Sequence, residues 1–434
     1  MIAFLTFLVV VLALLGAVHW YVWRRLVRDV TAPGGRARRL GTVLVVVLPL
    51  LSVGALASGR AGVPFVVQQV VAWPGFLWLA LLLYVVLALV VGEAVRPVLT
   101  RVLARRAAAA PAAAPVAVPA PAPVPVPERG QEGEESETGA EPEGETGAGV
   151  SASGVSASDV SRRLFVSRVV GGAAVAVAAG TVANGAYGVL RGPRVKRVTV
   201  PLAKLPRAAH GYRIAVVSDI HLGPILGRAH SQRIVDTINA TQPDLIAVVG
   251  DLVDGSVADL GPAAEPLAQL RARHGSFFVT GNHEYFSGAD AWVDHVRELG
   301  LRPLRNERLE IAAGFDLAGV DDVAGESEGR GPDFGRALGD RDRSRAAVLL
   351  AHQPIVIDDA VAHGVDLQLS GHTHGGQLWP GNFLAELANP TVAGLERYGD
   401  TQLYVSRGAG AWGPPVRVGA PSDITVVQLA SKQA

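Results

Sequence analysis

A buried strand that ends in two metal-capable side chains is predicted by the stretch Arg213-Ile-Ala-Val-Val-Ser-Asp-Ile-His221. Short β-branched runs of this kind are typical of strands that are covered on both faces. Alternate residues of an extended backbone face the same side, so Asp219 and His221 are expected to point together. An acid and an imidazole placed in this way are suited to binding one metal ion.

The same arrangement recurs four more times toward the C-terminus. Each apolar run stops, and a polar residue that can bind metal follows it. Helical spacing of apolar residues at 228–240 separates the first two runs, which indicates an α/β domain. In such domains, ligands gather at the carboxyl edge of the sheet. The further runs and the residues that follow them are 244–249 with Asp251, 277–279 with Asn282 and His283, 346–350 with His352, and 365–369 with His372 and His374.

These residue types suit a pair of divalent ions about 4 Å apart, which need oxygen and imidazole ligands and one bridging carboxylate. The chain contains no cysteine, which excludes thiolate ligands and disulfides. Asp251 is the predicted bridge, and His283 is the predicted general acid that protonates the leaving oxygen. The predicted ligands of the first ion are Asp219, His221 and His374, and those of the second are Asn282, His352 and His372.

The motifs in combination resemble those of the calcineurin-like metallophosphoesterases. They are Ser218-Asp-Ile-His-Leu-Gly223, Gly250-Asp251, Gly281-Asn-His-Glu284, His352 and Gly371-His-Thr-His-Gly-Gly-Gln377. The first and last are similar to those of the membrane-associated bacterial branch, which includes twin-arginine-exported enzymes and enzymes for lipid-linked phosphates. The resemblance implies a four-layer α-β-β-α sandwich over residues 193–434 and Mn²⁺, Fe or Zn²⁺ as the metal. The branch usually has Pro-Glu before the last strand, where this chain has Pro421-Ser422.

The N-terminal part, residues 1–106, reads as a membrane domain. Three apolar runs at 2–23, 40–57 and 73–91 are each about as long as a membrane-spanning helix needs to be. The segment between the first two holds six arginines, whereas the next loop holds Arg60 alone. Since positive residues favour the cytoplasm, the N-terminus is expected outside the cell membrane.

Residues 107–160 form a Pro/Ala-rich and then acidic segment, which predicts a disordered cytoplasmic linker. Residues 161–192 then combine Ser161-Arg-Arg-Leu-Phe165 with a soft apolar run at 169–189. Two interpretations are open: a twin-arginine-like export signal, or an ordinary fourth membrane-spanning helix. Either one places the C-terminal domain outside the cytoplasm, although the cluster Arg191–Arg197 counts against this topology.

The resulting hypothesis is a multi-pass membrane protein whose external domain hydrolyses a phosphomonoester, phosphodiester or pyrophosphate. A membrane tether favours a lipid-linked substrate, and a formal net charge of zero gives no reason to expect nucleic-acid binding. The alternatives are a non-catalytic metal-binding sensor or docking module on the same scaffold, and a nucleotide phosphodiesterase. The sequence does not identify the oligomeric state, the substrate or the native metal.

Overall fold

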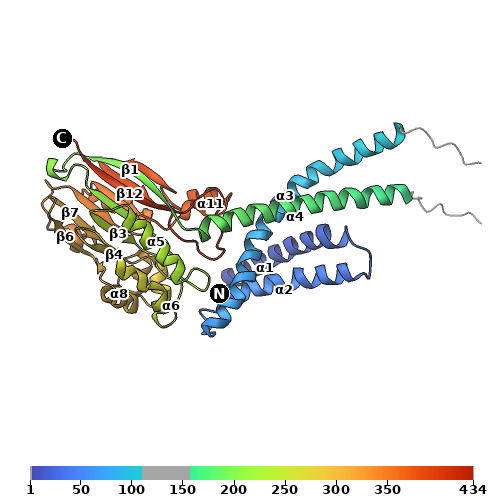
Figure 1. Ribbon diagram of the computed structural model, residues 1–434, viewed down its shortest axis with the longest axis horizontal. Helices are drawn as coiled ribbons and strands as arrows, with labels where there is room; N and C mark the ends of the chain where they lie inside the picture. Colours follow the sequence, from blue (N-terminus) through green and yellow to red (C-terminus); the bar gives the residue numbers. More distant parts are fainter. Residues whose placement is uncertain (1, 110–156, 434) are drawn as a thin grey trace, which may run out of the picture.

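The computed structural model describes residues 2–109 and 157–433, which form a helical bundle joined to an α/β sandwich (Figure 1). The predicted linker therefore lies almost wholly outside the described residues. Its first three residues continue one helix and its last four begin another. The helices of the bundle are α1 (Ile2–Trp23), α2 (Arg36–Ala57), α3 (Phe65–Ala109) and α4 (Ala157–Leu190).

Four segments of the described chain are long and apolar enough to cross a membrane: Val9–Arg28, Arg36–Ala57, Phe65–Arg106 and Arg162–Leu190. They overlap the four apolar runs predicted from the sequence. The third helix is much longer than predicted, at 45 residues, because helical structure continues on both sides of the apolar run. Most large apolar side chains of α1 and α2 are exposed, as is usual for helices that face lipid.

The sandwich contains two six-stranded mixed sheets. In the first sheet, β2 to β5 are parallel, β12 pairs antiparallel with β2, and β1 pairs parallel with β12. Its order is β1 (Arg194–Leu202), β12 (Asp423–Ser431), β2 (Arg213–Val217), β3 (Leu245–Val249), β4 (Ser276–Val279) and β5 (Arg302–Pro303). The order of the second sheet is β10 (Gly394–Tyr398), β11 (Thr401–Val405), β9 (Leu367–Ser370), β8 (Ala347–Leu350), β7 (Phe315–Gly319) and β6 (Glu307–Ile311).

Side-chain alternation along the strands builds the layers. Ile214 and Val216 of β2 face the second sheet in the central core, whereas Ala215 and Val217 face the helices outside the first sheet. The helices over the first sheet are α5 (Arg228–Ala240), α6 (Val257–Ala264) and α8 (Ala289–Glu298). Those over the second are α9 (Phe334–Leu338) and α10 (Ile357–Ala362). The predicted four-layer α-β-β-α sandwich is confirmed.

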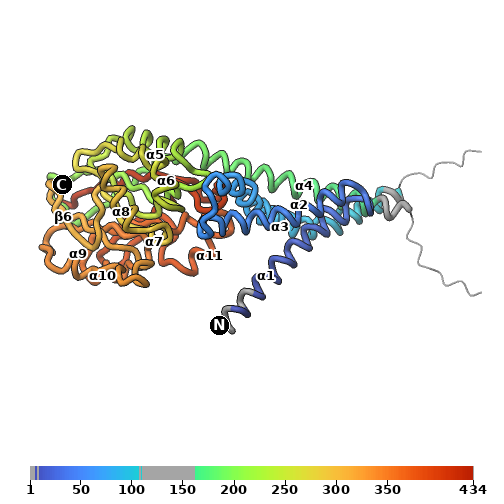
Figure 2. Tube along the Cα trace, turned by 90° about the horizontal axis from the view of Figure 1, so that it is seen from below, coloured from blue at the N-terminus to red at the C-terminus, as the bar shows by residue number. Residues whose placement is uncertain are grey.

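The bundle contacts the sandwich through α3, α4 and the loop that precedes β12. The Tyr84 hydroxyl of α3 donates to the carbonyl oxygen of Trp379 at 2.9 Å. Val416 is buried among α3 and α4 side chains. The short helix α11 (Gly381–Ala388) lies at the end of the sandwich nearest the bundle (Figure 2). The loops of that end also carry several of the predicted metal-binding residues.

Candidate metal centre

The eight predicted site residues come together at the carboxyl ends of β2, β3, β4, β8 and β9. Two groups of predicted ligands have ligand atoms that all lie within 4.8 Å of one another: Asp219, His221 and His374, and Asp251, His352 and His372. A third group, His221, Asp254 and His283, meets the same criterion. Each group contains a carboxylate and two imidazoles. The first group contains the three residues predicted to bind the first ion, and the second contains His352 and His372 with the predicted bridge Asp251.

In the first group the side-chain atoms point at one another across a small gap. His221 Nε2 lies 3.0 Å from His374 Nε2, and His374 Nε2 lies 3.3 Å from Asp219 Oδ1. Asp219 is held by the Ser218 hydroxyl at 2.6 Å and by the backbone N–H of His372 at 3.0 Å. Three buried atoms that could bind a metal ion therefore lie close together: His221 Nε2, His374 Nε2 and Asp219 Oδ1.

Asp251 lies between the two groups. Its Oδ2 is 3.8 Å from His221 Nε2 in the first group and 3.1 Å from His352 Nε2 in the second. His372 Nδ1 lies 2.9 Å from Asn282 Oδ1, so the predicted amide ligand also belongs to the second group. Asp251 thus lies within 4 Å of imidazoles from both groups.

Two imidazoles are oriented by hydrogen bonds at the nitrogen that faces away from the gap. His352 Nδ1 is 2.8 Å from the carbonyl oxygen of Val249, to which it can only donate. His221 Nδ1 is 2.9 Å from Asp254 Oδ1. These partners leave Nε2 of each neutral ring with its lone pair directed into the gap, which is the usual support of a metal-binding histidine.

The backbone is strained at this edge. Positive φ angles occur at Asp219, His221, Asp251, His372 and His374, where they range from 48° to 72°. Such angles are uncommon in residues that carry a Cβ, and they cluster at functional sites whose surroundings enforce them. The strain therefore indicates that side-chain placement, and not local backbone preference, determines the conformation here.

Electrostatics show whether divalent ions fit this site. Burial alone would favour neutral rings, but the carboxylate of Asp254, followed by those of Asp251 and Asp219, raises the pKa of His221 to about 9. The pKa of His352 is likewise raised by Asp251 despite burial. His352 Nε2 is buried and faces Asp251 Oδ2 at 3.1 Å. The carboxylates thus attract positive charge to this cluster, which divalent cations would supply in place of the protons on the rings, and the ligand types suit Mn²⁺, Fe or Zn²⁺.

His283 lies outside these two groups and belongs to the third, with His221 and Asp254. Its backbone N–H donates to Asp251 Oδ1 at 2.9 Å, and its ring meets that of His221 edge-on with centroids 4.7 Å apart. His283 Nδ1 is 2.7 Å from Asp254 Oδ1. Its side chain remains 16% exposed, so a substrate can reach it.

Asp254 is a residue whose role was not predicted from the sequence. One of its oxygens contacts both His221 and His283, and this pairing, led by His221, lowers the pKa of Asp254 to about 2 against the effect of burial. The sequence feature that could have revealed this role is the position of Asp254, three residues after the predicted ligand Asp251. An isolated parallel bridge between Leu222 and Val253 extends the pairing of β2 with β3 and brings Asp254 to His221.

Glu284 stabilises the backbone of the loops that carry the site residues. Its carboxylate accepts hydrogen bonds from the backbone N–H groups of Gly281 at 2.6 Å, Leu252 at 2.8 Å and Asp251 at 3.0 Å. Glu284 therefore ties the loop that carries Asp251 to the start of α7 (Asn282–Ser287), which carries Asn282 and His283.

Comparisons with known proteins agree with this geometry. A family model described as calcineurin-like phosphoesterase matches residues 212–376. An uncharacterized metallophosphoesterase of Aquifex aeolicus is 35% identical over 243 residues, which are 55% of this chain and 92% of that protein. The chain belongs to the calcineurin-like metallophosphoesterases. This family consists of metal-dependent phosphoester hydrolases.

Other metallophosphoesterases resemble the chain over a smaller share of their own length. A Danio rerio protein named transmembrane protein with metallophosphoesterase domain is 40% identical over 255 residues, which are 56% of this chain. An uncharacterized metallophosphoesterase of Helicobacter pylori is 38% identical over 252 residues, 57% of this chain and 67% of that protein. The chain spans 58% of the length of the Danio rerio relative and 57% of that of a Bos taurus relative with the same name.

Proposed function

We propose that this metallophosphoesterase is an active membrane-anchored hydrolase that binds two divalent ions and cleaves a phosphate ester of a lipid-linked substrate. The observation that carries the proposal is the convergence of two metal-capable groups around Asp251. Divalent ions bound there would polarise the phosphoryl oxygens and acidify a water molecule. A non-catalytic sensor would need the metal groups but not an oriented acid beside them.

His283 is the proposed general acid. Because its Nδ1 faces the Asp254 carboxylate at 2.7 Å, the other ring nitrogen is left to deliver a proton to the leaving oxygen. Asp254 orients the ring, as a carboxylate does for a catalytic histidine elsewhere.

The surface around the site supports a lipid-linked substrate. The Trp412 ring lies 5.8 Å from that of His283, and Trp412 is 51% exposed. The helix α11 buries none of its residues, and its Leu384 and Leu387 are 72% and 85% exposed. An apolar helix at the end of the sandwich nearest the membrane spans is suited to enter the lipid interface. A phosphate group attached to a lipid would then lie beside the metal groups.

Turnover by the protein in lipid nanodiscs tests both the metal-dependent hydrolysis and the lipid-linked substrate. After chelation of the metals, activity on an aryl phosphate should be lost and should return with Mn²⁺. A lipid phosphate should be a better substrate than a nucleotide. Absence of Mn²⁺-dependent turnover on every phosphoester would contradict the hydrolase.

The variant Leu384→Gln/Leu387→Gln separates the lipid proposal from the catalytic one. Loss of the apolar face should reduce turnover of the lipid phosphate while turnover of the soluble aryl phosphate stays the same. Equal activity of the variant and the wild type on lipid would contradict the role of α11 and leave the hydrolase proposal intact.

We also propose that the catalytic domain is extracytoplasmic. The α1–α2 connection and the outer ends of α3 and α4 lie at the end of the bundle away from the sandwich (Figure 1). That end carries the six arginines between Arg24 and Arg39, which favour the cytoplasm. Protease added to cells without a wall should cleave the sandwich. Resistance until the membrane is opened would reverse the topology.

The export route is a separate proposal, because Arg162 and Arg163 fit a twin-arginine signal that begins α4. Replacing both with Lys keeps the charge and should leave the domain inside. Unchanged export would remove the twin-arginine interpretation and leave the topology as proposed.

A further inference from the structure

A second pocket lies outside the metal centre, where the last turns of α4 meet the loop before β12. Its volume is about 360 Å³. The pocket is lined on one side by α4 residues that include Thr181 and Asn184 and by Arg191 just after the helix, and on the other by the loop that ends at Ser422. Arg194, at the start of β1, closes one end.

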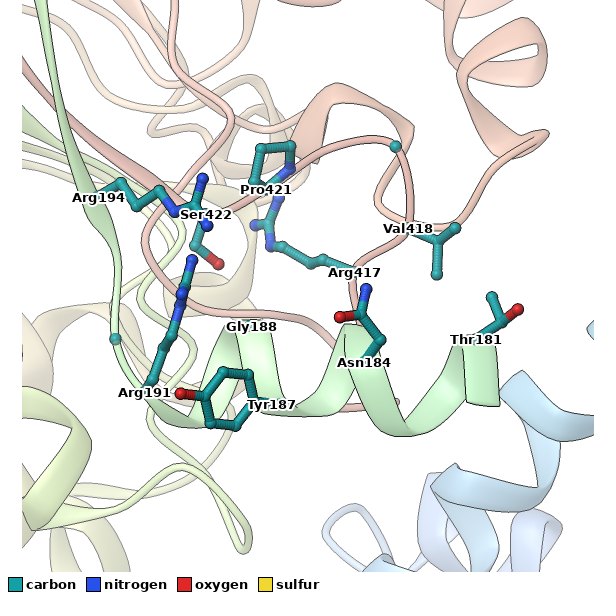
Figure 3. Close-up of a pocket in the computed structure, with 12 residues that line it drawn as sticks. Thr181, Asn184, Tyr187, Gly188, Arg191, Arg194, Arg417, Val418, Pro421 and Ser422 are labelled. Carbon is teal, nitrogen blue, oxygen red and sulfur yellow. The ribbon is translucent and has the colours of Figure 1, made fainter. Parts of the chain in front are cut away.

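Two positive charges gather at that end without a negative partner. The side chains of Arg191 and Arg194 both point toward Ser422 (Figure 3). Arg191 lies 5.6 Å from the Tyr187 ring centroid. Within residues 2–109 and 157–433, neither guanidinium pairs with a carboxylate. Ten potential N–H donors of two arginines therefore surround a space that an anion can enter.

Ser422 provides an independent indication of a ligand. The residue is only 5% exposed, and its hydroxyl has no hydrogen-bond partner in the described chain. Its position is determined by the backbone, since the Arg194 N–H donates to the Ser422 carbonyl oxygen at 3.1 Å. A buried hydroxyl without a partner is unfavourable, so a group that accepts a hydrogen bond from it is expected in the pocket.

Arg417 also lines the pocket but is already engaged. Its guanidinium donates to the carbonyl oxygens of Gly410 at 2.7 Å, His374 at 2.9 Å and Ala420 at 3.2 Å. It also lies 3.1 Å from His374 Nδ1. Arg417 therefore supports the loop and the metal group, and the anion site consists of Arg191, Arg194 and Ser422.

The position of the pocket indicates the kind of anion. Thr181, Asn184, Gly188 and Arg191 are spaced along one face of α4, over about 15 Å at 1.5 Å per residue. They belong to the last turns of the candidate span Arg162–Leu190 and to the residue just after it. The Thr181 end thus points along the span, and the arginine end points to the sandwich (Figure 3).

We propose that this pocket binds a phosphate group, with a membrane phospholipid as the source that its position favours. The phosphate contacts Arg191, Arg194 and Ser422, and the glycerol and acyl part extends past Thr181 along α4. A phosphate ligand would explain why Arg191 and Arg194 lie on the proposed outer side of the membrane, although positive residues favour the cytoplasm. The anion site is independent of the proposed hydrolysis, because none of its three residues belongs to the metal groups.

Binding to the full chain in detergent, with metals chelated so that no lipid is consumed, tests the proposal. Dioleoyl phosphatidylglycerol and dioleoylglycerol have the same acyl chains and differ in the phosphate-containing head. Native mass spectrometry should show phosphatidylglycerol retained and dioleoylglycerol lost. Inorganic phosphate is the competitor: displacement of the lipid identifies free phosphate as a sufficient ligand, and lack of displacement shows that the acyl part contributes.

Variants separate this pocket from general attraction to positive charge. Arg191→Gln/Arg194→Gln should weaken phosphatidylglycerol binding on the order of 10- to 100-fold, the worth of two charge-assisted hydrogen-bond partners. The control Arg197→Gln/Arg207→Gln removes the same charge from exposed residues outside the pocket and should bind like the wild type.

Ser422→Ala should fold normally, because the hydroxyl has no partner to lose, and should weaken binding several-fold. Equal retention of phosphatidylglycerol by the wild type and the pocket double variant would overturn the proposal. So would equal retention of phosphatidylglycerol and dioleoylglycerol by the wild type. Phosphoesterase activity is not measured here, so such a failure leaves the proposed function untouched.

Discussion

Gly281→Ala is expected to disable the metal centre by displacing Asp251. A Cβ at Gly281 would lie 2.3 Å from Asp251 Oδ1 and 2.5 Å from the Asp251 backbone nitrogen. Real Cβ contacts are almost never shorter than 3.0 Å, so the carboxylate must move by at least about 0.7 Å and its backbone with it. Gly281 itself has φ −108° and ψ −177°, which any residue can adopt. The effect is therefore purely steric.

The size of the loss follows from this displacement. Catalytic groups must be held to within about 0.5 Å, and a misplacement of about 1 Å can cost roughly 10² in rate. Asp251 contacts both metal groups, so the displacement affects both of them. We expect turnover of an aryl phosphate to fall by about 10² and the bound metal, measured by mass spectrometry, to fall below that of the wild type.

Gly227→Ala is a matched control. Gly227 also precedes a helix, has φ −104° and ψ −154°, and has nothing within 4 Å of the added Cβ. Its variant should retain normal metal content and turnover. Normal turnover and metal content in Gly281→Ala would refute the reasoning, because Asp251 would then tolerate a different position.

Three further predictions concern individual side chains. Asp251→Asn should lose metal and several orders of magnitude in turnover; retention of both would contradict the bridging role. His283→Ala should retain its metals but lose roughly 10²–10⁴ in turnover of an alkyl phosphate, and less with an activated aryl phosphate, whose leaving group hardly needs a proton. Equal losses on the two substrates would contradict the acid. Burial, followed by the charges of Arg233 and Arg417, lowers the pKa of His230 from 6.5 to about 3. Below pH 6.5 the unfolded chain therefore binds more protons than the folded chain. The free energy of unfolding then falls as the pH decreases from 6.5 toward 3. At pH 5 the loss of stability amounts to about 2 kcal/mol. The free energy of unfolding, measured by hydrogen exchange of β3, should lack this part of its pH dependence in His230→Leu. The same pH dependence in the variant and the wild type would contradict the prediction.

The metal-capable residues were predictable because each follows its own apolar strand directly. A buried strand is recognisable from a few adjacent residues, and parallel strands bring their carboxyl ends to one edge. Asp219 and His221 do share one group, but both have positive φ angles, so their pairing does not come from the extended backbone that the sequence argument assumed. The branch resemblance added the four-layer architecture, which local patterns do not contain.

The role of Asp254 depended on contacts between chain segments. Turn formation and histidine pairing are equally compatible with an Asp five residues after the end of a strand. The choice is made by the bridge between Leu222 and Val253, which holds Asp254 against His221 and His283. Such a pairing between two loops has no signature in either loop alone.

The local sequence determined the apolar spans, the strands and the residue types at their ends, because each depends on a short run of neighbours. Tertiary structure alone decided which side chains meet. The second sheet brings His352 to 3.1 Å from Asp251, and the pairing of Arg194 with Asp423 in β1 and β12 places Ser422 beside arginines more than 200 residues earlier. The physical reason is that sheet registry and layer packing are satisfied by the whole chain at once, so contacts distant in sequence follow from the global arrangement of the strands.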